Sequence, residues 1–215
     1  MFSIIQAAGW PIWPLLLASV IAVALIIERT ISLRDNKIVP PDLLEQVVSV
    51  YQRQGVSGDV VEKLAKDSPL GAVLAAGLRN YLSSRYVMKE AIEEAGRAVA
   101  HDMERFLTTL GTIATASPLL GLFGTVIGMI EIFGSQSPSG ANPQQLAHGI
   151  SVALYNTAFG IAISIPSLIF YRHSKNKVDT FVVEMEQQAA KLIDIVHGER
   201  MDYQGQSAGQ PRERA

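Results

Sequence analysis

The sequence predicts an all-α membrane protein with three transmembrane helices, an outside amino terminus, an inside carboxyl terminus and long cytoplasmic helical extensions. Two observations carry this prediction. Apolar side chains make up 48% of the 215 residues, which is high for a soluble domain. Residues 106–130 and 132–171 contain no Lys, Arg, Asp or Glu and are separated only by Glu131. Each stretch exceeds the roughly 20 residues that a membrane-spanning helix needs.

Composition excludes several kinds of function. The net charge of -2 leaves no basic excess for binding nucleic acid, and the chain has no cysteine for a disulfide, a thiolate metal site or a nucleophile. The histidines, His101, His148, His173 and His197, lack the spacing of metal ligands. We therefore predict no enzyme activity, no catalytic or metal site and no cofactor.

Three segments are long enough to span a bilayer: residues 9–27, about 107–133 and about 149–171. Positive charges orient them. All 18 Lys and Arg residues fall within 29–105 and 172–214, and basic loops remain in the cytoplasm. We therefore expect the amino terminus and the loop 134–147 to lie outside.

This topology divides the chain into five predicted regions. They are the first transmembrane helix (1–38), a cytoplasmic helical domain (39–105), a core of the second and third spans (106–171), a cytoplasmic helix (172–197) and a disordered tail (198–215). The first helix is expected to continue through Ile38 and to stop at Pro40 and Pro41, because proline lacks the backbone N–H. Within the cytoplasmic domain, helices are expected over 42–54, 58–66, 69–83 and from Tyr86 onward.

Apolar residues recur every three or four positions on both sides of the core. The two stripes are Met88, Ile92, Ala95, Val99, Met103 and Phe106 before it, and Val178, Phe181, Met185, Ala189, Leu192 and Val196 after it. They predict two helices that continue out of the membrane, each about 70 Å long. Packing inside one subunit and packing between subunits of a ring explain the stripes equally well.

Small and polar residues share one face on each of the last two spans. They are Ser117, Gly121, Gly124 and Gly128 on the second span, and Gly149, Ala153, Asn156, Gly160, Ser164 and Ser167 on the third, with Thr157 at the flank. Such faces let helix backbones approach closely in lipid, which predicts a packing role for Ser117, Gly121, Gly124, Gly128 and Gly160. The alternative is that both faces line a cavity, which the amide of Asn156 favours because it needs several hydrogen-bond partners.

Glu131 is a carboxylate inside a predicted span, which is costly in lipid. One interpretation is that its side chain reaches the outer headgroups. The other is that it relays protons.

The run ASPLLGLFGTVIG at 116–128, and the run GISVALYNTAFG at 149–160 with Ile165 and Pro166 beyond it, resemble the two signature spans of the MotA/TolQ/ExbB proton-channel family. The resemblance covers residues 105–172 closely. Three spans favour the ExbB and TolQ branch, because flagellar stator proteins of the MotA type have four.

The resemblance implies a homopentamer in the bacterial inner membrane, with most of its soluble part in the cytoplasm. The second and third spans would enclose a single-span partner that resembles ExbD or TolR and carries a membrane aspartate, and the complex would drive a TonB- or TolA-like protein. The channel-lining threonines of the family map onto Thr125 and Thr157. We add Asn156 and Ser164, which share the polar face, to the predicted channel lining.

The sequence departs from the family pattern at Val152, where many members carry a glutamate. We hypothesise that Glu131 substitutes for that acid as a proton relay. The alternative functions are a non-conducting scaffold that holds a partner helix and a TolQ-type subunit for envelope maintenance. Sodium in place of protons would require additional oxygen ligands.

Overall fold

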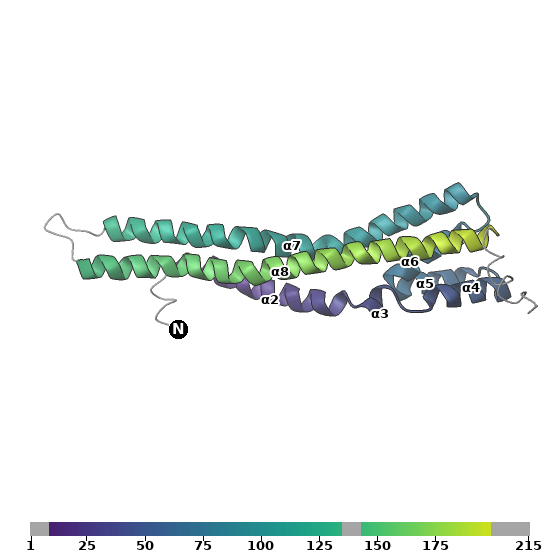
Figure 1. Cartoon of the computed structure of the whole chain (residues 1–215), viewed down its shortest axis with the longest axis horizontal. Helices are drawn as coiled ribbons and strands as arrows, with labels where there is room; N and C mark the ends of the chain where they lie inside the picture. Colours follow the sequence, from purple (N-terminus) through teal and green to yellow (C-terminus); the bar gives the residue numbers. More distant parts are fainter. Residues whose placement is uncertain (1–8, 135–142, 199–215) are drawn as a thin grey trace, which may run out of the picture. The chain divides into compact units, whose positions relative to one another are not determined.

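The computed structural model describes residues 9–134 and 143–198, and every regular element within them is a helix. The helices are α2 (Ile12–Ser32), α3 (Asp35–Ile38), α4 (Leu43–Gln54), α5 (Gly58–Asp67), α6 (Pro69–Arg79), α7 (Arg85–Gly134) and α8 (Pro143–Val196), labelled in Figure 1. Three of them, α2, α7 and α8, are long and apolar enough to cross a membrane. The predicted all-α class with three spans is confirmed, whereas the orientation of the spans stays a prediction.

The first helix ends earlier than the sequence predicts. Helix α2 ends at Ser32 instead of continuing through Ile38, and a separate turn of helix, α3, follows. Between them Leu33 is buried and Arg34 has an extended backbone, with φ -89° and ψ 136°. No strong helix breaker lies in this segment, so tertiary packing overrides local propensity here. The expected stop near Pro40 holds for α3, because proline disfavours helical geometry in the residue before it.

The outer loop, predicted over residues 134–147, also ends earlier than expected. Helix α8 begins at Pro143, where proline is tolerated because the first N–H groups of a helix have no intrahelical acceptor. Residues 135–142 of that loop, and all of the predicted tail beyond Gly198, lie outside the described residues. Helices α7 and α8 contain 50 and 54 residues, so the prediction that both polar spans continue as long helices is confirmed.

The chain forms two compact units. The first comprises Met1–Ser32 and Glu104–Asn176, and the second comprises Leu33–Met103 and Lys177–Ala215. The division into five regions made from the sequence stays a prediction.

The second unit has its own apolar core, made by α6 and by the stripes on α7 and α8. Its buried members include Leu70, Leu74, Met88, Ile92, Val178, Phe181, Met185, Ala189 and Leu192. Arg85 donates to Asp194 at 2.9 Å, which joins the first turn of α7 to the last part of α8. The apolar stripes are therefore used within one chain.

Helix α6 begins with a cap that sequence and structure both explain. Ser68 is 7% exposed and its Oγ accepts the backbone N–H of Gly71 at 3.0 Å, with Pro69 at the first helical position. Such a bond satisfies one of the free donors at a helix start. The absent Cβ of Gly71 matters as well, because an added Cβ would lie 2.3 Å from the carbonyl oxygen of Leu64.

Replacing Ser68 with alanine is expected to lower the free energy of unfolding of the full chain by about 1 kcal/mol, since it removes this cap. Ser57 is the matched control, because it occupies the same position before α5 but makes no side-chain cap. Ser57→Ala should change stability by only a few tenths of a kcal/mol. Unfolding in detergent, followed by circular dichroism, measures both. Equal effects of the two substitutions would contradict the assigned cap.

Candidate functional site

The candidate site lies where α7 and α8 run antiparallel inside the first unit, side by side in Figure 1. Their small-residue faces meet. A Cβ added to Gly121 would lie 2.7 Å from the Asn156 carbonyl oxygen. One added to Gly124 would lie 2.9 Å from Asn156 Cβ, and one added to Gly160 would lie 2.4 Å from the Ser117 carbonyl oxygen. Real Cβ atoms do not make such contacts, so the two backbones touch at Gly121 and Gly160, and the Asn156 side chain fills the space beside Gly124.

The close contact continues toward the ends of the helices that flank residues 135–142. An added Cβ at Gly128 would lie 3.1 Å from Ala153 Cβ, and one at Gly149 would lie 2.6 Å from the side chain of Ile132. In lipid, packing of this kind replaces the hydrophobic effect as the force that joins helices.

Thr125 and Thr157 form a hydroxyl pair across the two helices. Their Oγ1 atoms are 2.6 Å apart, and either can be the donor. The Thr125 hydroxyl also lies 3.2 Å from the Gly121 carbonyl oxygen on its own helix and 3.1 Å from that of Ala153 on α8. Both side chains are half-buried. Because each hydroxyl can donate and accept, the pair can pass a proton or contribute oxygen ligands to a cation.

The other two predicted lining residues occupy a different environment. Asn156 and Ser164 are 1% and 9% exposed and lie in the contact between α7 and α8. Ser164 donates its hydroxyl proton to the carbonyl oxygen of Ala114. Ser117 is 1% exposed, and its Oγ has no hydrogen-bond partner among the described residues. The structure thus brings the four predicted residues onto one helix pair but leaves only the threonines accessible at its edge.

Glu131 lies in the last turn of α7 with an exposed side chain. Val152 belongs to α8, but its side chain lies outside the described residues. The proposed exchange of roles between these two positions stays a prediction.

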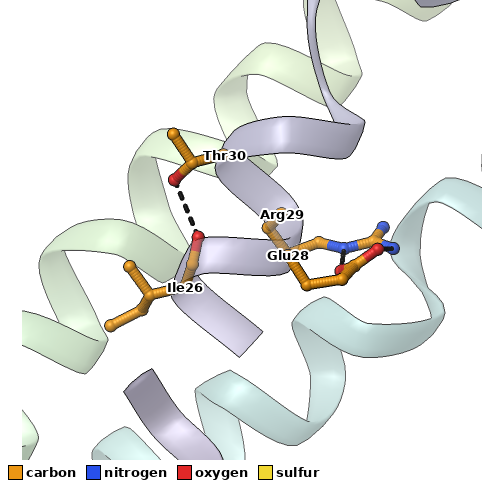
Figure 2. A network of polar contacts seen from close by, with 4 residues as sticks. All are labelled: Ile26, Glu28, Arg29 and Thr30. Atoms are coloured by element: carbon orange, nitrogen blue, oxygen red, sulfur yellow. Dashed lines mark hydrogen bonds and ion pairs between the residues drawn. The ribbon is translucent and has the colours of Figure 1, made fainter. Parts of the chain in front are cut away.

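A polar cluster at the other end of the first unit, near the end of α2, could hardly be predicted from the sequence. Arg29, in α2, is 6% exposed, donates to the carboxylate of its neighbour Glu28 as Figure 2 shows, and lies 4.9 Å from the centre of the Phe106 ring. The next residue, Thr30, satisfies its hydroxyl on the Ile26 carbonyl at 2.7 Å. A cation over an aromatic face is attracted by the ring electrons. Arg29 therefore fastens α2 to α7; its only sequence signal was its place at the end of an apolar run.

Acidic and basic side chains also pair between α7 and α8 at this end. Glu104 forms an ion pair with Lys175, and the Arg105 guanidinium lies 4.7 Å from the centre of the same Phe106 ring. Glu104, Arg105 and Lys175, which border the apolar parts of the two helices, are therefore matched with partners.

The outward faces of α7 and α8 are apolar and exposed. They carry Leu119, Leu122, Phe123, Val126, Ile130 and Phe133 on α7, and Leu154, Ile161, Ile165 and Ile169 on α8. A surface of this kind is suited to lipid or to the helices of other chains.

Comparisons with known proteins identify the family of the chain. Residues 65–187, which include all of α7 and the small-residue face of α8, match the model of the MotA/TolQ/ExbB proton channel family. The chain is 34% identical over 173 residues to a Synechocystis protein named ExbB-like 3, covering 77% of this chain and 80% of that one. It is 30% identical over 171 residues to the biopolymer transport protein exbB1 of Vibrio cholerae, with coverages of 76% and 74%. It is also 30% identical over 127 residues to the biopolymer transport protein ExbB of Aquifex aeolicus, with coverages of 59% and 80%.

The substitution Gly160→Ala is expected to destabilise the protein by about 1–3 kcal/mol, because its methyl group would overlap the Ser117 carbonyl. Gly96 provides the matched control, since it lies inside α7 but has no atom within 4 Å of an added Cβ. Gly96→Ala should therefore be neutral or stabilise the chain by up to about 1 kcal/mol through helix propensity. Thermal unfolding in detergent distinguishes the two. A tolerated alanine at position 160 would disprove the close backbone contact.

Proposed function

This chain belongs to the MotA/TolQ/ExbB proton channel family, and from that premise we propose that it is an inner-membrane proton-channel subunit. With an ExbD- or TolR-like partner, it uses the proton motive force to energise TonB-dependent or Tol-type transport across the cell envelope. Its family and its three apolar helices make it a multi-pass membrane protein. The proposal adds the amino-terminus-outside orientation and a homopentameric assembly.

The hydroxyl pair of Thr125 and Thr157 is the observation that carries the proposal. Two hydroxyls 2.6 Å apart, half-exposed at the edge of a helix contact and flanked by backbone carbonyls, provide a polar point in an apolar surface. A group that stays uncharged there avoids the cost of a buried ion. It can nonetheless hydrogen-bond to an acid, or to a water, on a helix that docks beside it.

The partner would supply that acid. In the proposed cycle, an aspartate on the partner's single span takes up a proton on one side of the membrane and releases it on the other, and the threonine hydroxyls of this subunit stabilise the intermediate position. A proton that crosses 100 mV releases about 2.3 kcal/mol. The subunit converts this energy into movement of the partner helix, which acts on a TonB- or TolA-like protein.

Replacing Thr125 or Thr157 with valine is expected to reduce proton flux about tenfold or more, because valine has the same shape but no hydroxyl. Serine at either position should retain most of the flux. Thr112→Val is the control, since Thr112 is exposed and its hydroxyl bonds to the Thr108 carbonyl of its own helix. The measurement is dye-reported flux into vesicles that contain the chain and its co-expressed partner. Full flux in both valine variants would favour the non-conducting scaffold.

We also propose that Glu131 relays protons at the end of the path. This chain has Val152 where many family members carry a glutamate, and Glu131 would replace that acid. Glu131→Gln is then expected to lower the same flux several-fold, while Glu131→Asp retains it. Glu62 is an exposed carboxylate of the second unit, and Glu62→Gln should leave the flux unchanged. If flux in Glu131→Gln equals that of the wild type, the relay is rejected and the side chain serves only at the membrane surface.

A further inference from the structure

We propose that Ser164 is a positioning residue: from α8, its hydroxyl replaces the backbone hydrogen bond that Pro118 removes from α7, and so fixes the register of the two polar spans. The inference concerns the packing of one subunit. It deepens the proposed function, because the same register brings Thr125 and Thr157 together.

The missing bond follows from helix geometry. In an α-helix the N–H of each residue bonds to the carbonyl four positions earlier, so position 118 should serve the carbonyl of Ala114. Proline has no N–H, yet α7 continues through Pro118 without a break. Ala114 is 3% exposed. Its carbonyl would therefore be buried without its usual donor, which is unfavourable inside a protein and more so in a bilayer.

Ser164 supplies the donor. Its Oγ lies 2.5 Å from the Ala114 carbonyl oxygen, and its side chain is 9% exposed. Two other serines of α8 behave differently: Ser167 bonds to the Ile163 carbonyl and Ser151 to that of Ala147, each four positions earlier on its own helix. Bonding within its own helix is the usual choice for serine and threonine in membrane helices. Ser164 instead bonds to the carbonyl that Pro118 has left without a donor.

The bond restricts how α7 and α8 align. Beside it, Gly160 lies against the Ser117 carbonyl and Gly121, so the two backbones are already in contact and cannot slide past one another without separating. A shift of one residue would move Ser164 by about 1.5 Å along the helix and turn it by about 100°. The hydroxyl would then lose the Ala114 carbonyl, and Thr157 would lose Thr125.

The test is a double-mutant cycle in the full chain. Ser164→Ala should lower the unfolding midpoint in detergent by roughly 3 °C, because it leaves the Ala114 carbonyl without a donor. Pro118→Ala alone should have little effect, since a carbonyl can accept two bonds. In the double variant, the backbone N–H that alanine supplies at position 118 reaches the Ala114 carbonyl, and most of the lost stability should return.

Two controls make the rescue specific. Pro166→Ala restores an N–H to a carbonyl on α8 and should not rescue Ser164→Ala. Ser167→Ala removes a buried hydroxyl whose acceptor, the Ile163 carbonyl, keeps its helical N–H, so its midpoint should stay near that of the wild type. If Ser164→Ala does not fold, the two double variants still decide the question. Ser164→Ala with Pro118→Ala should fold, whereas Ser164→Ala with Pro166→Ala should not.

Register has its own readout. The chain contains no cysteine, so cysteines introduced by Thr125→Cys and Thr157→Cys have no native thiol to react with. They form a disulfide with each other when positions 125 and 157 lie in contact. Ser164→Ala should reduce this cross-link severalfold, and adding Pro118→Ala should restore it. Additive effects of the two substitutions on stability, or cross-linking unaffected by Ser164→Ala, would overturn the inference. Neither measurement involves proton flux, so a failure of the proposed channel function would leave this result standing.

Discussion

The structure of the first unit depends on one constraint: two helix backbones approach so closely that glycine is required at the contact. In a bilayer, apolar side chains gain nothing by leaving lipid for another apolar surface, so helices associate through close packing and hydrogen bonds. At Gly121 and Gly160 the backbone of one helix occupies the space of a Cβ on the other. This contact brings the hydroxyls of Thr125 and Thr157 within 2.6 Å of each other.

Polar residues in these spans consequently divide into two groups with different tasks. Asn156 and Ser164 lie inside the contact, where their groups are enclosed by protein. The two threonines lie at its edge, half-buried, where another helix can reach them. A residue enclosed between α7 and α8 can set their alignment but does not meet a partner without a rearrangement. The edge is therefore the better place for chemistry with another chain, and the interior is the better place for positioning.

Several features followed from sequence alone because each depends on local pattern. Uncharged length predicted the spans, apolar periodicity predicted that α7 and α8 continue out of the membrane, and glycine spacing left close packing and cavity lining as alternatives. Features that depend on alignment between helices were not accessible. The sequence shows that Pro118 lacks an N–H, but not that Ser164 lies opposite Ala114. Nor does it show that packing of Leu33 ends α2 early, or that Arg29 lies over Phe106.

The same contact limits where proton-driven movement can take place in the proposed channel. Sliding α7 along α8 would drive Gly121 and Gly160 past carbonyls that already fill the space of a side chain, and would break the bond from Ser164 to Ala114. Both barriers are absent on the outward faces, where residues such as Phe123 and Ile161 are exposed. The helix pair is therefore suited to act as a rigid wall. In the proposed channel, the part that moves would then be the partner helix against this wall, with the threonine hydroxyls fixed in place as it passes.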